Sequence, residues 1–264
     1  MTGWAGGDVT PVASCMLAPN PGPMTLDGTN TWVLSAPGAA RAVVVDPGPD
    51  DPAHLRAVLT AVEARGARVG VVLLTHGHLD HSEAARSFAQ AAGGVAVRAL
   101  DPAHRLGEEG LGGGDVVEVD GLAVEVVATP GHTGDSLSFV LPASGALLTG
   151  DTVLGRGTTV VAYPDGRLAD YLDSLARLEE LVEERGLVDL LPGHGPALRH
   201  PLDVVRSYRR HRDERLDQVR AAVAAGARTP RDVVERVYAD VPREVWPAAE
   251  LSVRAQLEYL QNPR

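Results

Sequence analysis

The stretch that decides the fold is His76-Gly77-His78-Leu79-Asp80-His81. It directly follows the apolar, largely β-branched run at residues 69–75, which is short enough to predict a buried strand. A loop at the end of such a strand can aim its side chains into one pocket. Three imidazoles crowded into six residues have no evident packing benefit, whereas imidazole and carboxylate groups suit zinc, and also iron or manganese. The hexapeptide therefore predicts a metal site.

Three further strand ends carry a histidine or an aspartate beside a glycine. His132 follows the predicted strand 122–128, Asp151 follows the strand 146–148, and His194 follows the strand 188–191. Ligands in such sheets gather outside the strand ends. Taken alone, each residue has a simpler interpretation, because a buried histidine is often only hydrogen-bonded and a Gly-Asp pair is usually a turn. Together with the hexapeptide, they predict one shared pocket.

Strands and helices alternate up to about residue 198, and only helices are predicted after that. We therefore expect an α/β domain over residues 1–198 and a small helical domain over residues 199–264, with Ser82 as the N-cap of the helix 83–91. The expected strands cover residues 31–35, 42–45, 69–75, 95–98, 122–128, 136–141, 146–148 and 188–191, and the expected helices cover residues 54–65, 83–91, 168–184, 201–225, 230–238 and 244–260.

The order of these motifs resembles the metallo-β-lactamase superfamily. HxHxDH, a histidine in a PGHT segment, a GD pair and a late GH follow one another across residues 30–196. The resemblance implies an αββα sandwich with the metals along one edge. A closer resemblance is to the lactamase-beta-2-like branch, which is related to glyoxalase II and ribonuclease Z. It is carried by two segments, Asn20 to Trp32 and Gly150 to Gly155. The helical tail resembles the winged-helix-like C-terminal domain of that branch.

The resemblance also implies a set of metal ligands for two zinc ions, with iron or manganese as alternatives. His76, His78 and His132 would hold the first ion; Asp80, His81 and His194 the second; and Asp151 would bridge the two. Asp46 resembles a carboxylate that orients an imidazole in this superfamily, and Asp135 is a second candidate for that role; the simpler interpretation of both is a turn residue. No substrate-binding residue can be assigned.

The implied activity is hydrolysis of an ester or thioester acyl bond, with a metal-bound hydroxide as the nucleophile and Asp80 also accepting a proton. A single-strand endoribonuclease is the first alternative. Iron-dependent persulfide oxidation or a non-catalytic binding protein is the second. The best-known antibiotic-hydrolysing subclass has cysteine where Asp151 stands, so β-lactam hydrolysis is not the expected role. The expected partner is thus a small ester or thioester substrate, or single-stranded RNA.

Charge is distributed unevenly along the chain. The net charge is −11, yet residues 197–264 carry 13 arginines against 10 acidic residues. The arginines at 199–220 predict either a surface for RNA or an acidic substrate, or a solvated helix with i,i+4 ion pairs. The chain has no lysine, which excludes a P-loop lysine and a Schiff-base lysine.

The remaining features favour a cytoplasmic protein without a membrane anchor. The one cysteine cannot form an internal disulfide, the first residues lack the pattern of a secretory signal, and no apolar run approaches the roughly 20 residues that a membrane span needs. The other histidines, His54, His104, His200 and His211, lie in polar or helical stretches and are expected at the surface.

Overall fold

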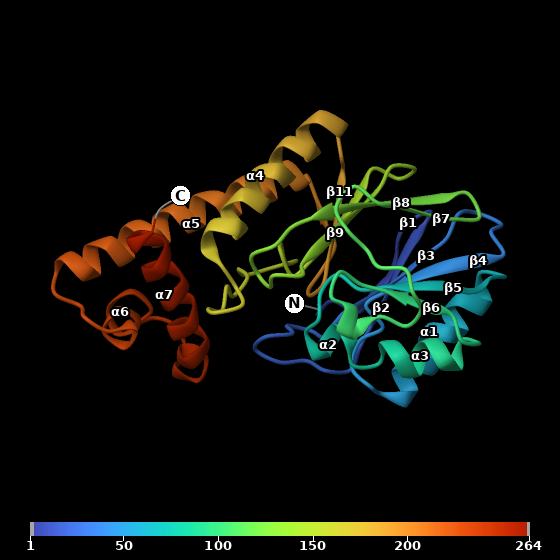
Figure 1. Cartoon of the computed structure of the whole chain (residues 1–264), viewed down its shortest axis with the longest axis horizontal. Helices are drawn as coiled ribbons and strands as arrows, with labels where there is room; N and C mark the ends of the chain where they lie inside the picture. The colour runs from blue at the N-terminus through green and yellow to red at the C-terminus, as the bar shows by residue number, and fades with distance from the viewer. Residues whose placement is uncertain (1–2, 263–264) are drawn as a thin grey trace.

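Two six-stranded mixed sheets face each other in the computed structural model, which describes residues 3–262 (Figure 1). In the first sheet the strands lie in chain order: β1 (Gly7–Thr10), β2 (Ala13–Leu17), β3 (Asn30–Leu34), β4 (Arg41–Val45), β5 (Arg68–Leu73) and β6 (Ala96–Arg98). The second sheet runs β12 (Leu198–Arg199), β11 (Asp189–Pro192), β10 (Ala146–Gly150), β9 (Leu137–Leu141), β8 (Leu122–Ala128) and β7 (Val116–Val119).

Helices connect the parallel strand pairs and cover the outer faces of the sheets. The helix α1 (Pro52–Ala64) joins β4 to β5, the helices α2 (Leu79–Ser82) and α3 (Ala85–Ala91) lie between β5 and β6, and α4 (Leu168–Arg185) joins β10 to β11. A 3-10 turn, η1 (Pro102–His104), follows β6. The predicted αββα sandwich is therefore confirmed.

Strand alternation explains why the sheets can be covered on both faces. Along β4, Val43 and Val45 point into the core between the sheets, whereas Val44 packs under the helices α1 and α3. Such two-sided burial follows from the period of two along a strand. The candidate ligands lie beyond the ends of these strands, outside the apolar layers.

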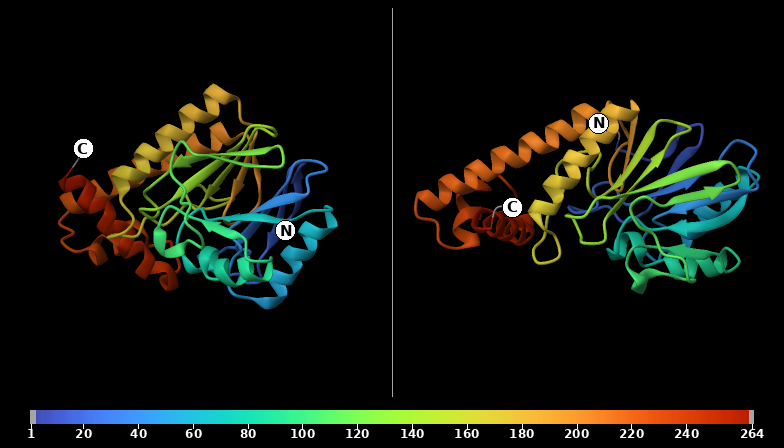
Figure 2. Two further views of the ribbon diagram at one scale, coloured as in Figure 1. Left: turned by 45° about the vertical axis from the view of Figure 1, so that its right-hand side comes forward. Right: turned by 45° about the horizontal axis from the view of Figure 1, so that its top comes forward.

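Three helices form the end of the chain: α5 (Pro201–Ala224), α6 (Pro230–Val237) and α7 (Trp246–Gln261), the last preceded by the 3-10 turn η2 (Arg243–Val245). Figures 1 and 2 show α6 and α7 at one end of the molecule, beyond α4. The helix α5 contributes to two hydrophobic clusters, with Val205 and Tyr208 packed against α4 and Val219 packed against α6 and α7. The domain boundary at residues 198/199 stays a prediction.

Two local predictions were wrong. Ser82 is the last residue of α2 and not an N-cap, and its hydroxyl donates to the carbonyl of Gly77 at 2.9 Å, because the chain already turns helical at Leu79. His54 is buried, since it lies on the inner face of α1 beside Leu55, and its Nε2 is 2.9 Å from the hydroxyl of Thr31. The hairpin of β1 and β2 was not predicted, because its first strand is largely exposed and lacks an apolar pattern.

Within residues 3–262, no helix combines the length and the apolar character that a membrane span requires.

Candidate metal centre

The ends of four strands meet at one edge between the two sheets. The hexapeptide follows β5, His132 follows β8, Asp151 follows β10 and His194 follows β11. The neighbouring strands β10 and β11 are parallel, so their carboxyl ends lie at the same edge. All seven predicted ligands are brought into this pocket, in groups whose ligand atoms lie within 4.8 Å of one another.

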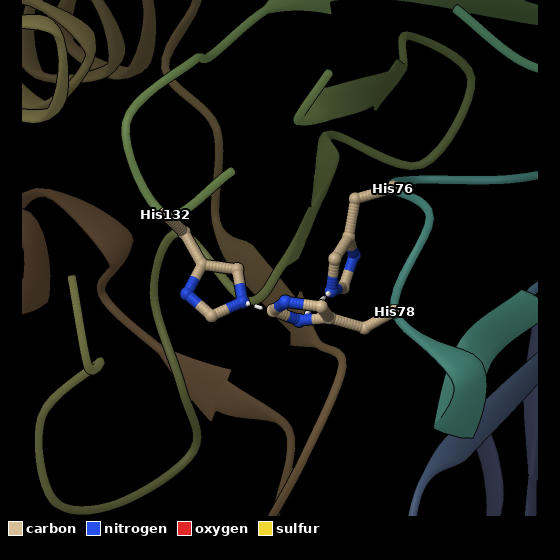
Figure 3. A group of neighbouring side chains, drawn as sticks. All are labelled: His76, His78 and His132. Carbon is tan, nitrogen blue, oxygen red and sulfur yellow. Dashed lines mark hydrogen bonds between the residues drawn. The ribbon is translucent and has the colours of Figure 1, made fainter. Parts of the chain in front are cut away.

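The first group consists of His76, His78 and His132 (Figure 3). The Nδ1 atom of His78 lies 3.1 Å from Nε2 of His76 and 3.0 Å from Nε2 of His132. Figure 3 shows the three rings converging from the loop after β5 and from the loop that carries His132. The other ring nitrogen of His132 faces the carbonyl of Val160 at 2.8 Å, which fixes the orientation of that ring.

The second group consists of Asp80, His81 and His194. The Nε2 atoms of the two histidines are 3.2 Å apart, and Oδ2 of Asp80 lies 3.1 Å from Nε2 of His194. Nδ1 of His194 is 3.1 Å from the carbonyl of Gly28, so the Nε2 atom of this ring is turned into the pocket.

Asp151 lies between the two groups. Its Oδ2 is 3.3 Å from Nε2 of His194 and 3.7 Å from Nε2 of His132, and its Oδ1 is 3.5 Å from Nε2 of His81. One carboxylate thus reaches a member of the first group and two members of the second. This placement matches that of a bridging ligand.

The donor set fits metal ions on two counts. Two nitrogens bound to one tetrahedral zinc ion lie about 3.3 Å apart, which is close to the 3.0–3.2 Å found between the paired imidazole nitrogens. The Oδ1 atom of Asp151 is buried and has no hydrogen-bond partner in the described part of the chain. Because an unsatisfied buried carboxylate oxygen is costly, a cation at this position would offset the cost.

Burial keeps two of the imidazoles neutral. Desolvation lowers the pKa of His76 well below its ordinary value, and the charge of His81 adds to this effect. Desolvation also lowers the pKa of His132, although the carboxylate of Asp151 opposes the shift. Both rings therefore have a free lone pair at neutral pH, as a metal ligand must.

In the second group, by contrast, nearby carboxylates raise the pKa of a histidine. Burial by itself lowers the pKa of His194, but the charge of Asp151 and hydrogen bonds to Asp151 and Asp80 raise it to about 10. Burial raises the pKa of Asp151, yet the charges of His194 and His81 outweigh it and hold this pKa well below its usual range. Protons on imidazoles therefore balance the carboxylates, and a metal cation would displace them.

Of the two carboxylates predicted to orient the imidazoles, only Asp46 contacts one. Its Oδ2 lies 2.9 Å from Nδ1 of His81. Asp135 instead accepts a hydrogen bond from the hydroxyl of Thr133 at 2.7 Å, and within residues 3–262 the structure gives it no hydrogen bond to a histidine.

Sequence reasoning missed the residues that hold the ligand loops. Asn30 donates to the carbonyls of Pro192 at 2.9 Å and Gly195 at 2.8 Å, so it clamps the loop that carries His194. Thr159 donates to the carbonyl of Asp151 at 2.7 Å. Asn30 belongs to the stretch Asn20–Trp32 that carries the family resemblance, and this was the available signal for it. Nothing in the local sequence marks Thr159.

Arg212 does not lie on the exposed helix face that was expected for the arginines of residues 199–220. Its side chain is buried, and an Nη atom donates to the carbonyl of Thr159. The helical period of α5 turns this one arginine toward the metal-site loop, while Arg206 and Arg209 face the exposed side of α4 and pair with Glu179.

Two hollows open onto the centre. One, of about 180 Å³, is lined by His132 and Asp151 together with Met24 and residues 156–160. The other, of about 480 Å³, lies over His78, which is the most exposed of the candidate ligands. A substrate can therefore approach the centre through either hollow.

Comparison with known proteins adds family information to this geometry. The profile described as Metallo-beta-lactamase superfamily matches residues 24–194, and the profile described as Beta-lactamase associated winged helix domain matches residues 229–263. A Beta-lactamase-like protein 2 homolog from Caenorhabditis elegans is 32% identical over 93% of this chain and 82% of its own length.

Two further relatives bear on function and on fold. An atrochrysone carboxyl ACP thioesterase from Aspergillus fumigatus is 32% identical over 87% of this chain and 74% of its own length. The crystal structure of a beta-lactamase domain protein from Burkholderia ambifaria matches with a TM-score of 0.82 and 24% identity, over 99% of this chain and 89% of the other. This last match supports the fold alone.

Proposed function

This chain belongs to the metallo-β-lactamase superfamily, and from that premise we propose that it is a metal-dependent hydrolase of a small ester or thioester. The observation that carries the proposal is the pair of converging ligand groups with the Asp151 carboxylate between them. When bound, a pair of metal ions supplies Lewis acidity and a nucleophilic water at neutral pH. His76, His78 and His132 would hold one ion, Asp80, His81 and His194 the other, and Asp151 both.

The residues of the chain supply positioning and proton handling. Asp80 is 29% exposed against 10% for Asp151, so it is the more exposed of the two carboxylates. Burial raises its pKa, but the hydrogen bond from His194 and the charge of His81 lower it to about 2. Asp80 is therefore ionised at neutral pH and is placed to accept a proton from the attacking water.

Two observations favour an acyl bond over a phosphodiester. A thioesterase stands among the relatives that match most of the chain. The arginines on the outer face of α5 are also largely used in ion pairs: Arg206 pairs with Glu179 and Glu183, and Arg220 with Asp217. Paired arginines leave little of the positive groove that a phosphodiester backbone requires.

A substrate screen tests the proposal. Zinc-loaded protein is offered an acyl thioester, an oxygen ester, single-stranded RNA and a chromogenic cephalosporin, and Asp80→Ala is assayed beside it. We expect cleavage of the thioester and a loss of at least about 100-fold in Asp80→Ala, while the exposed helix variant Asp173→Ala keeps its activity. Asp80-dependent cleavage of RNA without thioester cleavage would replace the proposal with the nuclease alternative.

The metal itself is tested by elemental analysis of the purified protein. Iron in place of zinc, with no hydrolysis of any ester, would favour oxidative chemistry instead.

A further inference from the structure

Arg212 is a buried cation for which residues 3–262 supply no anionic partner. Its side chain is 5% exposed, its guanidinium lies 4.8 Å from the centroid of the Tyr171 ring, and an Nη atom donates to the carbonyl of Thr159. Its Nε has no hydrogen-bond partner, and among residues 3–262 no carboxylate lies within ion-pair distance of it. A carbonyl and an aromatic face offset only part of the cost of burying this charge, so the position favours an anion.

A cavity of about 250 Å³ lies beside this guanidinium. Three of the residues that line it are basic, namely His211, Arg212 and Arg215, and none of its lining residues is Asp or Glu. Apolar side chains such as Met24 and Val245 form other parts of its wall. In a chain with a net charge of −11, a cavity whose charged lining groups are all basic favours a negatively charged ligand.

Arg215 is held in place but keeps free donors. Its guanidinium stacks 4.4 Å from the centroid of the Tyr238 ring, and its Nη1 donates to the carbonyl of Val237 at 2.9 Å and to Gln218 at 2.8 Å. Its Nε and Nη2 donate no hydrogen bond to any of the described residues. A fork of guanidinium donors matches the oxygens of a phosphate.

The cavity adjoins the metal centre. It shares Pro23, Met24 and residues 158–160 with the hollow that is lined by His132 and Asp151. A substrate can therefore place a reacting acyl carbon at the metal centre and its far end between α5 and α7.

We propose that this cavity binds a phosphate group at the far end of a small thioester substrate, with Arg215 as its hydrogen-bond donor and the buried charge of Arg212 beside it. This inference rests on the proposed hydrolase function. The apolar walls then contact the uncharged linker between phosphate and thioester, and the C-terminal helices confer substrate selectivity on the metal centre.

Binding of two non-hydrolysable ligands tests the subsite. S-methyl-4′-phosphopantetheine and S-methylpantetheine differ only in the phosphate, and calorimetry gives a Kd for each with the purified full chain. We expect the phosphorylated ligand to bind about tenfold more tightly, as for a charge-assisted contact. Equal Kd values in the unaltered protein would overturn the proposal, whatever the variants do.

Two arginine variants test which side chain causes the preference for the phosphorylated ligand. Arg215→Gln should reduce the preference to about twofold or less, whereas Arg220→Gln, an exposed arginine of the same helix, should keep it. Melting temperatures of both variants establish that they are folded. A preference for the phosphorylated ligand that persists in Arg215→Gln would contradict the assignment. So would a result in which Arg215→Gln weakens the binding of single-stranded RNA but leaves the binding of both pantetheine ligands unchanged.

Hydrolysis assays separate this proposal from the one on which it rests. A phosphate preference in binding without cleavage of any thioester would leave the subsite standing and remove the hydrolase function. Cleavage of acyl-pantetheine and acyl-phosphopantetheine with the same kcat/KM would leave the hydrolase function standing and remove the subsite.

Discussion

Oδ2 of Asp46 lies 2.9 Å from Nδ1 of His81, deep between the two sheets. The same carboxylate accepts hydrogen bonds from the backbone and the hydroxyl of Thr75, at 2.8 and 2.6 Å. Because its Nδ1–H is donated to a fixed acceptor, the His81 ring directs Nε2 toward His194 and Asp151, where a metal ion would displace the Nε2 proton. Asp46 therefore sets both the tautomer and the direction of a candidate ligand without entering the pocket.

Asp46→Asn should weaken zinc binding about 10- to 100-fold, because the partner that orients His81 loses its charge. Asparagine tolerates the positive φ of 52° at this position, so the backbone should be retained. Competition with a chromophoric chelator measures the affinity. Asp135→Asn is the matched control, and equal losses in the two variants would contradict the role of Asp46.

Asp151→Ala should lower the zinc content from two ions per chain to one or fewer, because this carboxylate lies between both ligand groups. Elemental analysis after purification measures the content. Asp173→Ala, at an exposed position of α4, should keep the full content. Two ions retained in Asp151→Ala would exclude a bridging role.

Gly193→Ala should weaken zinc binding by about tenfold or more through a steric clash. A Cβ at this position would lie 2.8 Å from Cε1 of His81 and closer still to Oδ1 of Asp151. The control is Gly112→Ala, whose Cβ would approach no atom closer than 3.9 Å. Competition with the chromophoric chelator measures the zinc affinity of both variants. An unchanged zinc affinity in Gly193→Ala would contradict the prediction, because it would mean that the loop shifts to accommodate the added methyl group.

Zinc binding should release protons and strengthen as the pH rises from 6 to 8. The raised pKa of His194, about 10, means that its ring holds a proton throughout this range, and zinc must displace it. Each displaced proton increases the apparent affinity up to about tenfold per pH unit. Calorimetry in two buffers of different ionisation enthalpy counts the protons, and a count of zero would contradict the prediction.

Cys15 should not react with a thiol reagent at pH 8 while the protein is folded. Burial raises the pKa of its thiol to about 12, although a hydrogen bond from Trp4 acts in the opposite direction. The thiolate fraction at pH 8 is then roughly 10⁻⁴. With a thiol reagent that releases a chromophore, the absorbance measures the extent of reaction. We expect the thiol to react only after the protein is unfolded in denaturant. Rapid labelling of the folded protein would contradict this burial.

Much of the sandwich and the set of candidate ligands could be predicted from local patterns. The run before His76 is apolar on both faces, which is typical of a strand covered on both sides, and glycines beside His132, Asp151 and His194 indicate turns at strand ends. Strand ends gather at sheet edges, so the residues expected to share a pocket could be identified without coordinates. The bounds of α4 and α5 were predicted to within one residue, because their apolar periods are clear.

The buried polar residues could not be predicted, because their burial depends on which faces of distant elements pack together. His54 and Arg212 lie in polar or helical stretches, as surface residues do, yet α1 turns one toward Thr31 and α5 turns the other toward Thr159. The sequence by itself determined the elements and the candidate ligand chemistry, since both depend on residue type and short-range spacing. Only the tertiary structure decided that the C-terminal helices line a basic cavity beside the metal centre, because that cavity forms between α5, α7 and loops that lie far from them in the sequence.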